Sequence, residues 1–64
     1  MTLALHIVAD TDAFGTSDPA RNRELARILR QFANRLERYD GADHGAAGTL
    51  LDGNGNTVGK WRLT

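Results

Sequence analysis

The sequence predicts a single α+β domain with the order β-α-β-β, in which a three-stranded sheet carries one amphipathic helix on one face. Three observations predict it: an apolar alternation opens the chain, a long segment with helical spacing follows, and two β-rich segments flank an Asn/Gly turn near the C-terminus. The 64 residues allow one core, because a chain this short removes only about 60% of its unfolded surface from water.

Residues 2–9 predict the first strand, because aliphatic and β-branched types alternate there with a period of two. Leu3, Leu5 and Ile7 form one side of the alternation. The other side is predicted to belong to a sheet face that no helix covers, and such a partly apolar face suits a dimer or partner contact. This bare face holds Ala4, His6, Val8, Leu51 and Val58, unless the hairpin slips by one residue.

A long amphipathic helix is predicted over residues 19–40. Asp18 is expected to accept hydrogen bonds from first-turn N–H groups, and Pro19 suits the first helical position, where its missing donor has no intrahelical acceptor. Gly41 supplies a left-handed stop. Helical spacing assigns one face to the core, and this face consists of Leu25, Ile28, Leu29, Phe32, Ala33 and Leu36.

A β-hairpin is predicted over residues 49–63, because the Gly and Asn residues at 53–56 tolerate the positive φ that hairpin turns require. The small residues of 41–48 predict a flexible connection between helix and hairpin. Trp61, on the last strand, is expected to pack against the helix, since a small core needs its few large side chains.

Phe14 lies in a polar segment, 10–17, that is predicted to be a loop. Two interpretations stay open for it. Phe14 either staples onto the first helical turn or is an exposed anchor for a partner, and the shortage of large core residues favours the staple.

Composition limits the classes of function. Eight Lys and Arg residues balance eight Asp and Glu residues, so no general attraction to nucleic acid or to an anionic membrane is expected. The absence of cysteine excludes disulfides and Cys/His catalysis, and it favours partner binding or self-association as support for a thin core. The N-terminus lacks the features of a signal peptide, which predicts a cytoplasmic protein.

The predicted helix carries six arginines, and four of them fall within a band about 80° wide opposite the core face. Arginine forks suit phosphates or carboxylates, so this arginine stripe is a candidate partner-binding site, although a solvated helix face is the commoner explanation. Glu24 is expected to offset Arg27 and, at the same spacing, Arg21. The stripe consists of Arg23, Arg27, Arg30 and Arg38.

No cofactor, metal site or catalytic residue is predicted. The run Asp-Gly-Asn-Gly-Asn at 52–56 resembles the start of a calcium loop, but Thr57 and Leu63 stand where such a loop requires Gly and Glu. Turn chemistry therefore explains the run. His6 and His44 have no nearby nucleophile in a recognisable motif, so an enzyme is not expected.

Three segments resemble a group of small uncharacterised proteins of proteobacterial genomes and their phages. They are DTDAF at 10–14, ELARILRQFANRLE at 24–37 and LLDGNGNTVGKW at 50–61. The resemblance implies a phage or mobile-element origin, and very small phage proteins often block a host machine.

The expected function is that of a small, non-enzymatic protein-interaction module, with a homodimer as one form of it. The alternative is a phage or mobile-element inhibitor of a host defence or nucleic-acid-processing complex that uses Arg23, Arg27 and Arg30 on an acidic surface. Direct nucleic-acid binding ranks third, because few aromatics and no nucleic-acid-binding signature accompany the arginines.

Overall fold

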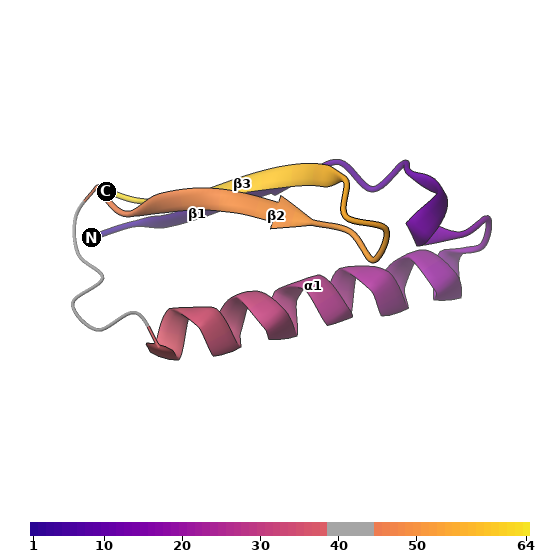
Figure 1. Cartoon of the computed structure of the whole chain (residues 1–64), viewed down its shortest axis with the longest axis horizontal. Coiled ribbons are helices and arrows are strands. Elements are labelled where there is room, and N and C mark those ends of the chain that lie inside the picture. Colours follow the sequence, from indigo (N-terminus) through magenta and orange to yellow (C-terminus); the bar gives the residue numbers. More distant parts are fainter. Residues whose placement is uncertain (39–44) are drawn as a thin grey trace.

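The computed structural model describes residues 1–38 and 45–64. Figure 1 shows the helix lying along one face of the sheet, which confirms the predicted α+β class and element order. Among the described residues, no helix has the length and apolar character needed to cross a bilayer. The elements are β1 (Leu3–Ile7), a 3₁₀ turn η1 (Asp12–Phe14), α1 (Asp18–Arg38), β2 (Ala47–Leu51) and β3 (Thr57–Leu63).

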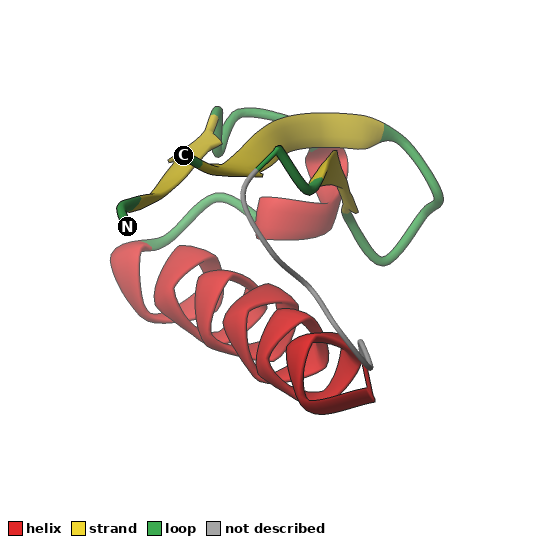
Figure 2. Cartoon of the chain, turned by 90° about the vertical axis from the view of Figure 1, so that its left-hand side faces the viewer, coloured by secondary structure: helices red, strands yellow, loops and turns green. Residues whose placement is uncertain are grey.

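The sheet has the order β1-β3-β2, which the sequence had left open. The last strand is central and antiparallel to both neighbours, so β1 and β2 run in the same direction with β3 between them. No described element covers the other face of the sheet (Figure 2). Strand β2 begins at Ala47, inside the segment predicted as a flexible connection, and residues 39–44 of that region and of the predicted helix end, including Gly41, lie outside the described residues.

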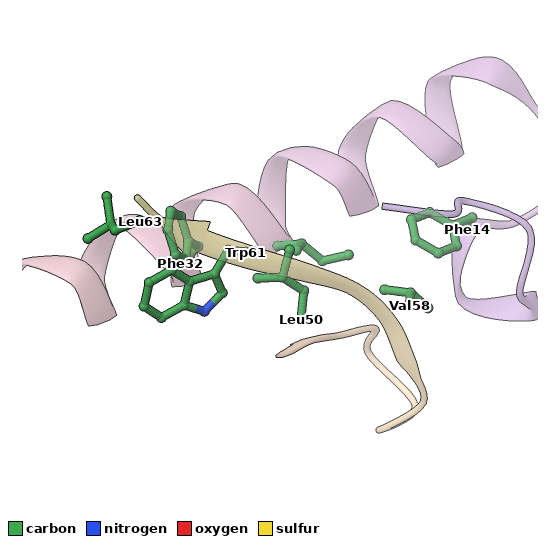
Figure 3. Close-up of a cluster of buried hydrophobic side chains, with 7 residues drawn as sticks. Phe14, Phe32, Leu50, Val58, Trp61 and Leu63 are labelled. Carbon is green, nitrogen blue, oxygen red and sulfur yellow. The ribbon is translucent and has the colours of Figure 1, made fainter. Parts of the chain in front are cut away.

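Trp61 packs against the helix as predicted, with its ring 5.2 Å from that of Phe32 and tilted by 56° (Figure 3). A Cβ atom at Gly48, the residue opposite on β2, would lie 2.5 Å from Nε1 of Trp61. Only glycine therefore lets the indole lie across β2. Among the described residues, the buried apolar side chains of the core are Phe14, Ile28, Phe32, Leu50, Val58, Trp61 and Leu63.

Phe14 is 1% exposed and closes the end of the core next to Val58 (Figure 3). The turn η1 places it there, with the Phe14 N–H donating to the carbonyl oxygen of Thr11 at 3.0 Å. The alternative that Phe14 is an exposed partner anchor is wrong, because the side chain is buried in the core cluster, whereas its stapling onto the first helical turn stays a prediction. Burying one aromatic side chain stabilises a fold by roughly 1.5–3 kcal/mol. In so small a core, this gain favours burial of Phe14 over its exposure.

The helix begins one residue earlier than predicted. Ser17, not Asp18, is the capping residue, because its Oγ accepts the Ala20 N–H at 3.2 Å and its carbonyl accepts the Arg21 N–H at 3.0 Å. Asp18 therefore lies inside the first turn, where it forms an ion pair of 3.3 Å with Arg21.

The buried face of α1 is rotated away from the predicted stripe. Ile28 and Phe32 are buried, whereas Leu29 is 48% exposed and Ala33 is exposed, so these last two are corrections. The physical reason lies on the other flank of the helix. The Gly53 N–H of the hairpin donates to Glu24 Oε2 at 2.7 Å, which turns the flank that bears Glu24 toward the sheet.

Val58 belongs to the core and not to the bare face. The pairing with β2 shifts where Leu50 faces Gly59 and Leu51 faces Thr57, which leaves Val58 as an extra residue on β3. Such a bulge re-aims the side chain at the extra position. Val58 is accordingly 6% exposed and is a correction to the predicted bare face, while Leu51, another predicted member, borders a hollow lined by α1 residues.

Candidate binding surfaces

The uncovered face of the sheet is basic. Lys60 and Arg62, two residues apart on β3, are exposed and point away from the helix, as alternation with buried Trp61 and Leu63 requires. We call this surface the basic sheet face, and a shallow hollow of about 580 Å³ lies over it. Its exposed members are Ala4 and His6 from β1, Ala47 and Thr49 from β2, and Lys60 and Arg62 from β3.

The strand register places small or neutral side chains around the two cations. Arg62 lies between Ala4 and Ala47, while Lys60 lies between His6 and Thr49. Within residues 1–38 and 45–64, no acidic residue belongs to this face, and the ion pairs there leave Lys60 and Arg62 without a carboxylate partner. Both cationic heads are therefore available to an anionic ligand.

The arginine stripe does not act as one unit. The Arg27 guanidinium donates to both carboxylate oxygens of Glu24, at 2.7 and 2.9 Å, as the three-residue spacing predicted. Arg38 borders a polar hollow beside Leu51. Arg23 and Arg30 remain exposed on the helix, with no ion-pair partner within residues 1–38 and 45–64.

Glu24 and Arg27 serve the fold, and their electrostatics agree with this. The hydrogen bonds from Arg27 lower the pKa of Glu24 below its ordinary value, and a backbone N–H from Gly53 acts in the same direction against the effect of burial. The same pair raises the pKa of Arg27. An arginine held by two short hydrogen bonds inside its own chain is a poor candidate for a partner-binding group.

Asp52 is buried and organises the hairpin turn. Its carboxylate accepts the Thr11 hydroxyl at 2.5 Å, the backbone N–H groups of Asn54 and Asn56 at 2.9 Å each, and the Asn56 side-chain amide at 3.2 Å. The Thr11 bond is the largest of the effects that lower the pKa of Asp52 to about 2, and burial opposes it. The interpretation of 52–56 as turn chemistry is consistent with these bonds.

Metal ligands are not grouped in the described part of the chain. Within 1–38 and 45–64, no three His, Asp or Glu side chains gather in a position to hold an ion. His6 is a single exposed imidazole on β1, and His44 lies outside the described residues.

Sequence reasoning missed Lys60 and Arg62 as site residues. The available signal was their spacing of two on a predicted strand, which puts both on one face. That spacing becomes meaningful only when β3 is known to be the central strand and when the helix is known to cover the opposite face.

Comparisons of the chain with protein-family models, with curated proteins and with solved structures return no match. The resemblance to small phage-associated proteins therefore stays a prediction.

Proposed function

We propose that this protein is a small interaction module that holds an acidic segment of a partner protein on its basic sheet face. The observation that carries the proposal is the pair Lys60 and Arg62 at the centre of a hollowed sheet face on which the described part of the chain places no acidic side chain. Arg27, by contrast, is neutralised inside the fold by Glu24.

The neighbours of the two cations favour carboxylates as ligands. Ala4 and Ala47 flank Arg62 with single methyl groups, so a planar carboxylate can approach the guanidinium fork from the solvent side. His6 and Thr49 flank Lys60 with additional hydrogen-bonding groups. An extended acidic peptide laid along β3 would meet these groups at strand spacing.

Protein is favoured over nucleic acid as the partner for two reasons. Among the described residues, no Phe, Tyr or Trp side chain is exposed on the basic sheet face, because Trp61 is 3% exposed and packs in the core, so His6 is the single ring there on which a base could stack. The formal net charge is zero, so the whole molecule does not attract a polyanion over distance.

A pull-down from bacterial lysate, with and without nuclease, tests the proposal. The double variant Lys60→Glu/Arg62→Glu is expected to lose a protein partner that the wild type retains after nuclease treatment. The matched control Arg23→Glu/Arg30→Glu makes the same charge change on the helix and should keep that partner.

Two results would contradict the proposal. If only the Arg23/Arg30 control lost the partner, the binding site would lie on the helix and not on the basic sheet face. Loss of all partners on nuclease treatment, together with steeply salt-sensitive binding, would identify nucleic acid as the ligand.

A further inference from the structure

The two outer strands of the sheet differ in how their free edges are finished, and β1 is the open one. Thr2 and Thr64 exchange two backbone hydrogen bonds, of 2.7 and 2.9 Å, at the start of the β1–β3 ladder. In an antiparallel ladder such pairs alternate, so the odd residues of β1 direct their N–H and C=O groups away from β3. These residues are Leu3, Leu5 and Ile7.

The side chains along this edge are apolar and incompletely covered. Leu3 is 42% exposed, and Leu5 and Ile7 are half-buried against the core. On α1, Leu29 is 48% exposed and lies away from the flank that contacts the β2–β3 hairpin through Glu24 and Arg35. A regular edge strand with free backbone groups, no Pro, no Lys and apolar side chains is a template for pairing with another strand.

We propose that β1 pairs with β1 of a second copy of this chain, antiparallel about a two-fold axis at Leu5. The strand is self-complementary in this register: Leu5 faces Leu5, Leu3 faces Ile7 and Ala4 faces His6. Each of the Leu3–Ile7 and Leu5–Leu5 pairs uses only backbone groups that β3 leaves free.

Charge and size both favour a second copy as the occupant. Strand β1 contains no Lys, Arg, Asp or Glu, and the chain has zero formal net charge, so two copies approach without a charge penalty. A 64-residue chain without disulfides also gains from a shared core, because small domains commonly depend on such support. The apolar side chains of both edges would then meet on the helix-bearing side.

The pairing would extend the basic sheet face. On the outer side of the joined sheet, the His6, Lys60 and Arg62 groups of both copies would lie on one continuous surface. The inference concerns a different surface from the proposed partner site, so either can fail alone: the sheet-face variants test partner binding, and the experiments below test only self-association.

Sedimentation equilibrium over a range of protein concentrations measures the association. The wild type is expected to form a dimer, and Leu3→Lys is expected to raise its dissociation constant by roughly tenfold or more, because it puts a charge on the shared apolar edge. Leu51→Lys is the matched control, since Leu51 is 45% exposed on the other outer strand, and its dimer should persist. A helical circular-dichroism spectrum verifies that each variant folds.

Cysteine cross-linking tests the register at two exposed positions of a chain that has no native cysteine. In the proposed register the Cα atoms of Ala4 and of His6 in the second copy lie about 4.5 Å apart, within disulfide range. Ala4 and its own copy are two residues out of register, about 7–8 Å apart and too far to bridge. Mixed Ala4→Cys and His6→Cys chains should therefore cross-link, whereas Ala4→Cys alone should not.

A wild type that stays monomeric at every concentration would overturn the proposal. So would a dimer that Leu51→Lys breaks and Leu3→Lys does not, or one in which the mixed cysteine chains fail to cross-link.

Discussion

The two outer edges of the sheet differ: the β2 edge is partly covered, whereas the β1 edge is open. At the β2 edge, the Arg35 guanidinium donates to the Thr49 carbonyl oxygen at 3.4 Å, and the pairing is irregular at Leu50 and Leu51. At the β1 edge the register is regular from Leu3 to Ile7. Because a covered and irregularly paired edge strand disfavours strand addition, any edge pairing is expected at β1.

The largest expected effect comes from filling the space that Gly48 leaves on β2. Gly48→Val places a side chain where Trp61 lies, since even a Cβ would come within 2.5 Å of the indole nitrogen, and overpacking of this kind costs about 1–3 kcal/mol. Ala47→Val, on the exposed side of the same strand, should stay within about 0.5 kcal/mol of wild type. Urea unfolding measures both. Equal stability of the two variants would show that β2 does not depend on this contact.

Acid should lower the stability of the folded chain through Asp52, which follows β2 in the hairpin. Its pKa is lowered from 3.8 to about 2 in the fold, so the folded chain binds fewer protons than the unfolded chain between these values. The stabilisation from Asp52 is therefore complete above about pH 4 and is lost as the pH falls toward 2. The lowered pKa of Glu24 acts with the same sign.

Urea midpoints measured across this acid range test the Asp52 prediction. Asp52→Asn should lower stability at neutral pH and flatten the acid limb, because the amide NH₂ cannot accept the hydrogen bonds that the carboxylate does. Asp10→Asn is the control, since Asp10 is an exposed carboxylate. An acid limb that Asp10→Asn flattens as much as Asp52→Asn would refute the assignment.

The smallest expected effect on stability comes from uncovering the β2 edge. Arg35→Ala removes one exposed contact to Thr49 and should cost no more than about 0.5 kcal/mol. It should nevertheless increase concentration-dependent light scattering, because a second open edge permits chains to join on both sides. Arg23→Ala removes the same charge from the exposed helix surface and should leave scattering unchanged. Equal scattering from both variants would show that Arg35 does not protect the β2 edge from pairing with another chain.

The rotation of α1 illustrates what periodicity leaves undetermined. The apolar spacing identified the helix and the burial of Ile28 and Phe32, but a hydrophobic arc wider than the contact allows several rotations about the helix axis. The choice among them depends on Glu24 and Gly53, which are 29 residues apart and meet only in the folded chain. Leu29 was assigned to the core for that reason and is instead exposed.

In the candidate site, too, the sequence showed the spacing of the charged residues, and the tertiary contacts decided which of them are available. The arginine stripe was visible from helical spacing, yet the pairing of Arg27 with Glu24 removed one member from it. Lys60 and Arg62 gained their importance only from the central position of β3.

The sequence by itself determined the fold class, the element order and the packing of Trp61 on the helix, because these depend on local periodicity, turn residues and the scarcity of large side chains. The tertiary structure alone decided the strand order, the inward turn of Val58 and the contrast between the two edges. Those features arise from backbone pairing between distant segments. Because almost every residue carries the same backbone donor and acceptor, the residue types do not show which segments will pair.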